Sequence, residues 1–600
     1  MKKSVLGVFL YSASLMSLAV ELEPLVVTAS RSAQSLEDVL ASVSVISRED
    51  IARQQAQSLH DVLRGLAGVN LSDSGNTSLF LRGTNAGHVL VLLNGVKVGS
   101  ATAGTTAFSQ IPIEQIDRIE VVRGPRSSLY GSEAIGGVIQ IFTRKPTSVS
   151  SAFFSFGAGS EHTYRLNNGF SLGFSQGWLS AQVGAANSVG FNRCRGSETA
   201  GCFTVEPDQD GYDQQSWTLQ GGHRFSNGLE IETQLLRTRD QSEFDGSFQN
   251  RAKTLQQVFG QKLSYDVSDN WKLDLSIGQS RDQSDNFKDE VFISQFDTQR
   301  DHVVLQSDHL LNDNHSIIAG LDYQQDAVDS STNYSDTSRE NTGVFLQYQV
   351  GLGNNDWQFA IRQDDNEQFG QQKTGTMAWG YRVIPSLRIV SEYGTAFKAP
   401  TFNDLFYPGF SNPNLTPETS ESVDVALKGW ANWGHWDVTA YHTDIDQLIA
   451  LDASFKPDNL NRVRIRGVDS RVSAHFGEDW HFVGNLSWLD TENQSEANKG
   501  NELPRRPSLS SRIDLDRNMG QYQWGATLVA NGDNYDDLAN TQRLTGYATL
   551  DLRGAYLPSK EWQLQMRIAN LLDKTYETVA FYTQPSRGVF LTISFNTKDQ

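Results

Sequence analysis

The strongest constraint on this sequence is a period-two alternation of apolar and polar residues that recurs from about residue 150 to residue 595. In one run, Trp271, Leu273 and Leu275 are separated by Lys272 and Asp274. Because successive side chains of a β-strand point to opposite faces, each run predicts a strand with one apolar and one polar face. A membrane β-barrel with a wet interior needs this pattern, and a closed barrel satisfies its backbone hydrogen bonds inside lipid. Similar runs begin at Val423, Trp562 and Val589.

The length of this region indicates a large barrel. Residues 151–595 number 445. Plugged outer-membrane barrels have about 22 strands, which leaves about 20 residues for each strand and its connection. A spanning strand needs roughly 10 of them, so about half of the region would form turns and extracellular loops. The sequence therefore predicts a membrane β-barrel of about 22 antiparallel strands.

Two soluble architectures share the alternation. A β-sandwich and an array of propeller blades also combine an apolar face with a polar face on each strand. The sequence has no fixed-period repeat, which weakens the propeller interpretation. Alternation alone leaves a soluble β-sandwich open.

The first residues are typical of a secretion signal. Lys2 and Lys3 precede a mostly apolar stretch, and Ala19 ends a small-x-small cleavage site, so residues 1–19 are predicted to be a signal peptide. No later run reaches 18 apolar residues, so we expect no membrane-spanning helix. These features predict an exported protein that is periplasmic, secreted or an outer-membrane barrel.

The only two cysteines are Cys194 and Cys202. Since an exported protein folds in an oxidising compartment, a local disulfide is the expected state, and two free thiols would require a reducing one. The disulfide would staple a single loop.

Residues 20–145 are predicted to form a small α/β domain. Ser47 and Ser58 each begin a capping box, which predicts two helix starts. The second helix would be short and amphipathic, and Gly68 could end it. Strands are expected at residues 78–81, 88–93, 116–122 and 138–143, with glycines between them.

Charge and motif content narrow the function. The formal net charge of −20 argues against a nucleic-acid partner. The sequence holds no GxSxG, HExxH, CxxC or P-loop pattern, and the 11 histidines show no metal-ligand spacing. We therefore do not expect an enzyme.

Motifs spread over nearly the whole chain carry a family resemblance. Plug-like motifs lie at residues 81–85, 88–96 and 123–138, and barrel-like motifs at 396–400, 412–418 and 570–577. Together they resemble the TonB-dependent receptors of the outer membrane, and residues 81–96 resemble the cobalamin receptors of that family. The resemblance implies a plug domain at 20–145 inside the lumen of a barrel at 146–600. It also implies an outer-membrane monomer that contacts lipid and is energised by the protein TonB with its inner-membrane complex.

A segment just after the signal peptide resembles a TonB box, the segment that TonB binds in this family. It is short, extended and rich in β-branched residues, so it could add a strand to a sheet of the partner. From the residue pattern alone, the simpler interpretation is that this segment is the first strand of the plug. Its position just after the signal peptide favours a TonB box. Its residues are Pro24, Leu25, Val26, Val27, Thr28 and Ala29.

The resemblance also implies a latch between plug and barrel. Plug arginines of this family pair with acidic residues of the barrel wall, and the matching residues here are Arg82, Arg123, Asp424 and Asp469. Alternation independently places both aspartates in the lumen. Asp424 alternates with Val423 and Val425, and Asp469 alternates with Val468 and Val472, so the valines would face lipid. A partly desolvated arginine–carboxylate cluster would hold the plug reversibly. Ordinary solvated lumen charges are the alternative.

The ligand implied by the resemblance is cobalamin or a related corrinoid, bound by loops of the plug and barrel on the extracellular side. An amide side chain suits it, since an amide both donates and accepts hydrogen bonds. The alternative is a siderophore or haem receptor on the same scaffold. A siderophore receptor would be expected to carry basic or aromatic clusters at the apex of the plug, whereas residues 99–107 are small and neutral. The matching positions are Asn76, Ser78, Asn85, Thr102, Ala103 and Arg505.

Cobalamin receptors of this family also order extracellular loops with calcium. Asp208 and Asp210 resemble part of that site, with Asp245 as a third ligand and Glu206 as a possible fourth. Clustered carboxylates suit a hard cation that takes many oxygen ligands. Plain acidic loops in an acidic protein are the alternative.

Overall fold

The computed structural model describes residues 26–27, 31–145, 150–197, 201–452, 454, 456–477 and 479–597. The predicted signal peptide lies outside these residues, as do Pro24, Leu25, Thr28 and Ala29 of the predicted TonB box. Among the described residues, no helix is both long and apolar enough to cross a membrane.

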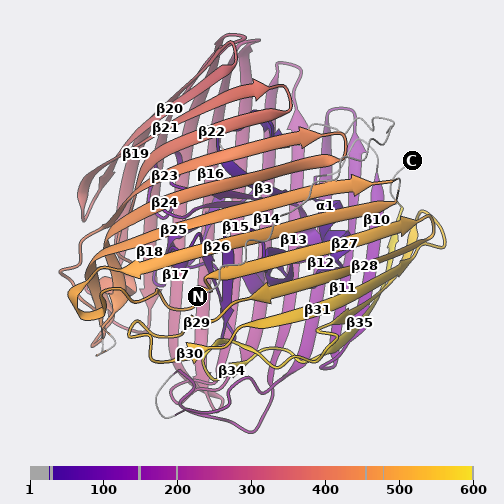
Figure 1. Ribbon diagram of the computed structural model, residues 1–600, viewed down its shortest axis with the longest axis vertical. Coiled ribbons are helices and arrows are strands. Elements are labelled where there is room, and N and C mark those ends of the chain that lie inside the picture. Colours follow the sequence, from indigo (N-terminus) through magenta and orange to yellow (C-terminus); the bar gives the residue numbers. More distant parts are fainter. Residues whose placement is uncertain are drawn as a thin grey trace, which may run out of the picture.

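A closed barrel of 22 antiparallel strands forms the outer wall of the molecule (Figure 1), as the alternation and length predict. Each strand pairs with its neighbours in chain order, and the last strand, β35, closes the barrel against β10. The strands are β10 Ser151–Gly159, β11 Thr163–Phe174, β12 Gly177–Phe191, β13 Asp210–Arg224, β14 Leu229–Glu243, β15 Arg251–Ser268, β16 Trp271–Lys288, β17 Val291–Asn312, β18 His315–Ser330, β19 Ser338–Leu352, β20 Asn355–Asn366, β21 Gly370–Ile384, β22 Leu387–Lys398, β23 Glu418–Ala431, β24 Gly434–Leu451, β25 Pro457–Phe476, β26 Trp480–Asn493, β27 Leu509–Met519, β28 Tyr522–Asn531, β31 Tyr547–Tyr556, β32 Trp562–Ala569 and β35 Gly588–Asn596.

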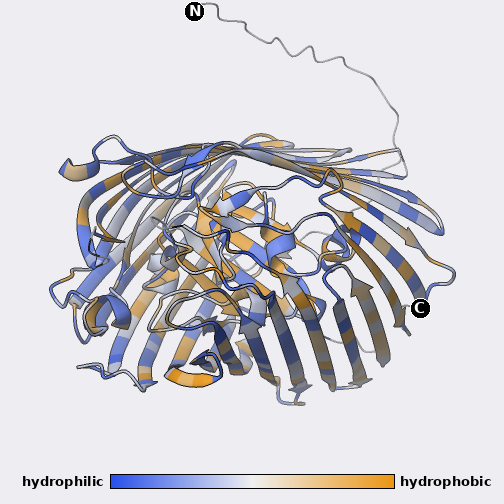
Figure 2. Ribbon diagram, turned by 90° about the horizontal axis from the view of Figure 1, so that it is seen from below, coloured by the Kyte–Doolittle hydropathy of each residue, from blue (hydrophilic) through white to orange (hydrophobic). Residues whose placement is uncertain are grey.

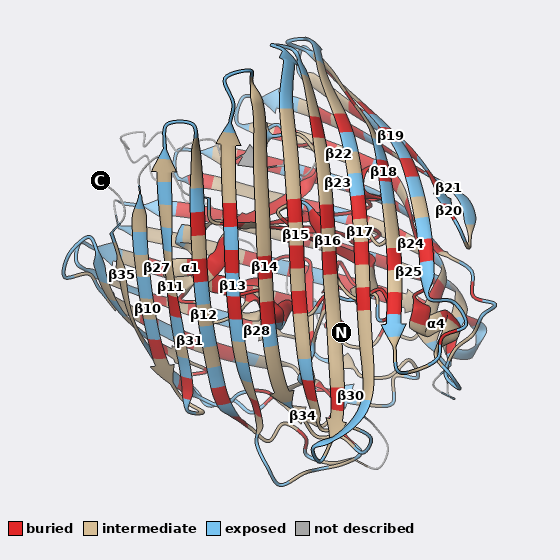
Figure 3. Ribbon diagram, turned by 180° about the vertical axis from the view of Figure 1, so that it is seen from behind, coloured by how far each residue is buried: buried red, intermediate tan, exposed pale blue. Residues whose placement is uncertain are grey.

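Side-chain exposure follows the predicted alternation. On β23, Val423 and Val425 are 45% and 49% exposed, whereas Asp424 between them is 6% exposed. Buried and exposed residues alternate in the same way along other strands (Figure 3). The exposed face is therefore apolar and suited to lipid, and the inner face is polar. A soluble β-sandwich is ruled out by closure of the sheet.

Loop lengths orient the barrel. Short turns such as residues 175–176 and 269–270 join strands at one end, and long connections such as 192–209 and 399–417 join them at the other. Outer-membrane barrels have short periplasmic turns and longer extracellular loops. The long loops therefore mark the extracellular side.

The N-terminal domain fills the bore and has a core of its own. Figure 2 shows its apolar elements inside the ring of strands. Its five-stranded sheet has the order β3-β8-β9-β6-β7, with a separate β4–β5 hairpin. Among the described residues, the main buried apolar cluster of this domain includes two barrel residues, Leu236 and Val258, and four smaller clusters join plug residues to the barrel wall. The elements are β3 Ser42–Ile46, α1 Arg48–Gln54, α2 Leu59–Leu63, β4 Val69–Asp73, β5 Thr77–Leu81, β6 Val89–Leu93, β7 Val96–Val98, β8 Ile116–Arg123, α3 Ser127–Tyr130 and β9 Gly137–Thr143.

The predicted helix starts are confirmed, and one predicted helix end is wrong. Ser47 and Ser58 cap α1 and α2 through their side chains. Helix α2 ends at Leu63, before Gly68, because a barrel arginine donates hydrogen bonds to the last carbonyl groups of the helix. Arg512 Nη1 lies 2.9 Å from the carbonyl oxygen of Asp61. The end of this helix is therefore set by a contact that is distant in sequence.

Candidate ligand site and plug–barrel contacts

Three plug segments reach the extracellular side and carry the predicted ligand residues. Asn76 is exposed in the turn of the β4–β5 hairpin, and Ser78 is half-buried on β5. Asn85 lies between β5 and β6. Thr102 and Ala103 lie in residues 99–107, which we name the apex loop. The structure thus places five of the six predicted ligand residues on one end of the plug.

Asn85 is held by the barrel on both sides of its amide. Its Oδ1 accepts a hydrogen bond from Arg506 Nη2 at 2.6 Å, and its Nδ2 donates to the carbonyl of Ile449 at 3.3 Å. The predicted barrel residue Arg505 instead pairs with Asp536, with Nε–Oδ1 at 2.6 Å. The arginine that reaches the predicted ligand residue is therefore the next one along the chain.

Arg506 is buried without a carboxylate within 4.0 Å in the described part of the chain. Its guanidinium donates to the carbonyls of Gly83 and Thr84 and lies 4.2 Å from the centre of the Phe80 ring. Burial lowers the pKa of Arg506, and the charge of Arg505 lowers it further. An unpaired buried charge is costly, so these carbonyl contacts hold Arg506 at the plug surface.

A short barrel helix covers part of the apex loop. Helix α4, Phe402–Phe406, lies in the β22–β23 connection and is capped by Thr401. The amide of Asn403 donates to the carbonyl of Thr102 at 3.1 Å. Thr102 is consequently buried, whereas Ala103 stays exposed. Of these two predicted ligand residues, only Ala103 is open to an extracellular molecule in this conformation.

A buried charged group links the plug to the barrel below this site. His88 Nε2 lies 3.0 Å from Glu418 Oε2, and Lys398 Nζ lies 3.4 Å from the same oxygen. His88 Nδ1 accepts a hydrogen bond from the amide of Asn85, so the proton of a neutral ring is on Nε2, facing Glu418. The sequence does not predict this cluster of charged residues, because its members lie in three separate segments.

The predicted latch brings three of its four residues together. Arg82 Nη1 lies 2.6 Å from Asp424 Oδ2, and Arg82 Nε lies 3.0 Å from Asp469 Oδ2. Tyr441 packs against the same guanidinium, 4.4 Å from its ring centre. All of these side chains are buried, so a charge-assisted cluster joins plug and barrel.

Arg123 lies beside this cluster but binds inside the plug. Its Nε donates to the carbonyl of Ala67 at 2.8 Å and its Nη2 to Ser44 at 3.0 Å. Among the described residues it has no carboxylate within 4.0 Å. The second plug–barrel pair is made instead by Arg126, which binds Glu392 through both oxygens, at 2.6 and 2.8 Å. Arg126 belongs to the same plug motif, and alternation on β22 places Glu392 in the lumen.

The segment that follows the predicted TonB box is also tied to the lumen. The backbone of Val26–Val27 forms β1, which pairs with β2, Gln34–Ser35. Between them, Arg31 lies 3.4 Å from Asp322 of β18 and stacks on Tyr130 at 4.7 Å. A pull on the N-terminal segment is therefore opposed by the β1–β2 pairing and by the buried Arg31–Asp322 ion pair.

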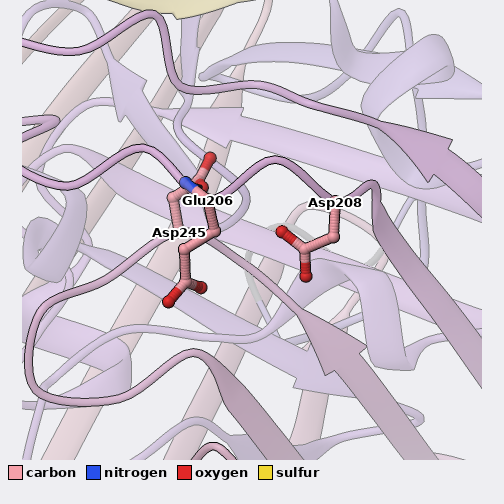
Figure 4. Close-up of side chains that lie close together, drawn as sticks. All are labelled: Glu206, Asp208 and Asp245. Carbon is pink, nitrogen blue, oxygen red and sulfur yellow. Dashed lines mark hydrogen bonds between the residues drawn. The ribbon is translucent and has the colours of Figure 1, made fainter.

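The predicted calcium ligands are partly assembled. Glu206 and Asp208 of the β12–β13 loop and Asp245 of the β14–β15 loop place one carboxylate oxygen each within 4.8 Å of the others (Figure 4). Asp210 instead accepts a hydrogen bond from the amide of Arg193 at 2.8 Å. Glu206 pairs with Lys288. Burial raises the pKa of Asp245, and the neighbouring carboxylates raise it further, whereas two backbone amides oppose the shift.

The two cysteines stabilise the first of these loops. Cys194 and Cys202 form a disulfide with a Cα–Cα distance of 5.7 Å. The amide of Cys194 donates to Asp245 Oδ2 at 3.3 Å. The disulfide therefore sits directly against the acidic cluster.

A closed barrel of 22 strands with the chain's own N-terminal domain in its bore defines a plugged outer-membrane transporter. Comparison with known proteins agrees. The family model described as "TonB dependent receptor-like, beta-barrel" matches residues 141–571, and that described as "TonB-dependent Receptor Plug Domain" matches residues 35–138. The chain belongs to the TonB-dependent receptor family, and it is therefore an outer-membrane protein.

Relatives of known name support this assignment. The vitamin B12 transporter BtuB of Photobacterium profundum is 32% identical over 591 residues, which cover 95% of each chain. Among solved structures, a mutant of the ferric enterobactin receptor PfeA of Pseudomonas aeruginosa has a TM-score of 0.80 at 16% identity, covering 92% of this chain and 98% of its own. The siderophore receptor PiuA of Acinetobacter baumannii has a TM-score of 0.79 at 16% identity, covering 94% and 97%. The two solved structures show the fold alone.

Proposed function

We propose that this protein carries out TonB-dependent active transport of cobalamin or a related corrinoid across the outer membrane. The observation that carries the proposal is the 32% identity with a vitamin B12 transporter over 95% of both chains. The plug fills the bore, so passage requires the plug to move. The ligand would bind at the extracellular end of the plug, beside Asn85 and Ala103.

The chemistry of the apex loop supports an uncharged ligand. Residues 99–107 contain no charged side chain. A receptor for an anionic iron–siderophore complex would need basic groups there, which makes the siderophore or haem alternative the weaker one. Amide and hydroxyl groups, such as those of Asn76 and Ser78, recognise a neutral ligand that carries many amides.

The N-terminal segment would be the binding site for TonB. Within the described part of the chain, Val26–Val27 pairs with β2 over two residue pairs. Such a short pairing is easily exchanged for a strand of a partner sheet, since each backbone hydrogen bond contributes only about 0.5–1.5 kcal/mol net. We propose that Pro24–Ala29 binds TonB and that the pull passes to Arg31.

Calcium is the proposed cofactor of the extracellular loops. Glu206, Asp208 and Asp245 would supply three carboxylate oxygens to one ion, which takes six to eight oxygen ligands in all. Since Glu206 also pairs with Lys288, the ion would compete with that lysine. Binding would join the β12–β13 and β14–β15 loops.

The test is uptake of radiolabelled cyanocobalamin by cells with and without this protein, each with and without TonB. Uptake should require both. Equal uptake in all four strains would contradict the transport proposal. An excess of ferric siderophore should leave uptake unchanged, whereas competition would favour the alternative ligand class.

A further inference from the structure

A chamber lined by both polar and apolar side chains separates one side of the plug from the barrel wall in the periplasmic half of the bore. Its volume is about 280 Å³, and it is lined by plug strands β6, β7 and β9 and by barrel strands β12–β18. At its periplasmic end lies the ion pair of Lys145 and Glu232, whose lysine side chain is 50% exposed. The chamber therefore lies far from the ligand site at the extracellular end of the plug.

The lining of the chamber is rich in neutral amides. Its ionised groups are largely paired with one another: Lys262 with Asp274 at 3.0 Å, for example. Gln220 is 3% exposed, and its Nε2 has no hydrogen-bond partner among the described residues. His302 Nδ1, also on the lining, is likewise unpartnered there. The amide residues are Asn94, Gln140, Gln220, Gln234, Gln261 and Gln306.

The plug is attached differently on the two sides of the bore. On β22–β25 it is held by the buried pairs of Arg82 and Arg126 with barrel carboxylates. On β13–β15, its contacts inside the bore are between neutral side chains, as in the hydrogen bond of Thr143 with Gln220 at 3.0 Å. Neutral contacts exchange with water at lower cost than buried ion pairs, so β13–β15 form the weaker attachment. Strands β17 and β18, which also line the chamber, hold the plug through the pairs of Glu133 with Arg300 and of Arg31 with Asp322.

The β6–β7 hairpin connects this chamber to the ligand site. Its Asn94-Gly95 turn lies in the chamber, with φ of 47° and 88°, values typical of a two-residue turn. Strand β7 is the edge of the plug sheet and runs directly into the apex loop. A ligand that moves the apex loop therefore pulls on the element that lines the chamber.

We propose that this chamber is a second, internal binding site through which the ligand passes, and that it takes a neutral molecule bearing many amide groups. The proposal rests on the transport function proposed above. At about 280 Å³ the chamber lies below the usual range of sites for drug-sized ligands. The β6–β7 hairpin must therefore leave the wall for the ligand to enter, and the ligand then leaves along β13–β16.

Two engineered disulfides test the route. A Cβ built on Gly260 lies 2.8 Å from Val96 Cγ2, so V96C with G260C would tie β7 to β15. Ser128 Oγ lies 2.7 Å from Thr376 Oγ1, so S128C with T376C would tie α3 to β21 on the opposite side. Each pair is compared with its single-cysteine variants, with and without reductant, for binding and uptake of labelled cyanocobalamin.

Oxidised V96C/G260C should bind cyanocobalamin at the cell surface normally but lose uptake at least tenfold, and reductant should restore it. Oxidised S128C/T376C should keep uptake within about twofold. Parental uptake by the first variant, or equal loss in both, would overturn the route. Failure of the parent protein to take up cobalamin would instead defeat the proposed function.

The amide lining has its own test. Gln220→Leu keeps the size of the side chain and removes both its unpartnered donor and the acceptor of the Thr143 hydrogen bond, and Thr143→Val, which removes that hydrogen bond but leaves the Gln220 donor in place, is the control. The maximal uptake rate should fall roughly two- to tenfold, the effect of one lost hydrogen bond, with the half-saturating concentration unchanged. An unchanged rate would overturn the role of the lining in binding the ligand.

Discussion

Removing one carboxylate of the Arg82 cluster should loosen the plug by a measurable amount. Asp424→Asn keeps the shape of the side chain but leaves Arg82, which is 4% exposed, with a single carboxylate partner. Loss of one partner of a buried ion pair costs about 3–5 kcal/mol. Because Asp469 remains in contact at 3.0 Å, we expect the lower end, about 3 kcal/mol.

The consequence is a faster release of the plug under load. If the contact is broken in the transition state, about 3 kcal/mol corresponds to roughly a hundredfold faster release. The assay pulls on the N-terminus of single reconstituted molecules and records the force at which the plug unfolds. The matched control is Asp266→Asn, since Asp266 pairs only with Arg224 of the barrel, and both side chains are more than half exposed.

A double-mutant cycle separates the pair from its surroundings. Arg82→Gln with Asp424→Asn should cost at least about 1 kcal/mol less than the sum of the two single changes, because the double variant removes both charges of the pair. Additive costs, or an unchanged unfolding force for Asp424→Asn, would refute the latch.

Three further predictions concern the N-terminal segment and the extracellular loops. Asp322→Asn should release Arg31 and speed protease cleavage of the N-terminal segment in the intact protein; unchanged cleavage would contradict this role for the pair. Calcium affinity, measured by titration calorimetry, should fall as the pH is lowered towards the pKa of Asp245, which burial raises, because the protonated carboxyl cannot bind the ion; a pH-independent affinity would exclude Asp245 as a ligand. Replacing Cys194 and Cys202 by serine frees a loop whose closure is worth about 2.5 kcal/mol, and should weaken calcium binding several-fold, whereas an identical titration would show that the disulfide does not order the cluster.

The barrel could be predicted because strand alternation is a local property. In a run of alternating residues, the apolar side chains, such as those of Val423 and Val425, identify the face that meets lipid. The residue between them must then face the lumen. For that reason the lumenal positions of Asp424 and Asp469 followed from sequence alone. The same alternation also places Glu392 in the lumen. Its partner, Arg126, lies in a plug motif that can be recognised in the sequence.

Loop residues could not be placed in this way. Arg505 and Arg506 are adjacent and chemically identical, so composition and spacing do not distinguish them. The structure does, because Arg505 has a φ of 63° and turns the chain so that the two side chains diverge, one to Asp536 and one to Asn85. Asp210 differs from Asp208 for a similar reason: strand β13 begins at Asp210 and its carboxylate binds a backbone amide.

Part of the contact between plug and barrel consists of hydrogen bonds that water can replace. Barrel cations bind plug carbonyl oxygens directly: Lys428 Nζ lies 2.9 Å from Val39 and 2.7 Å from Ala41, and Arg512 binds the end of α2. Water can replace each of these contacts, whereas the apolar cluster that joins Val39 and Val122 of the plug to Phe345 of the barrel must be separated when the plug moves. Movement of the plug against the barrel therefore breaks buried ion pairs such as Arg82–Asp424 and also exposes part of the apolar clusters that plug and barrel share. We expect a pull on the N-terminal segment to load the Arg31–Asp322 pair before the Arg82–Asp424 pair, because Arg31 precedes Arg82 in the chain.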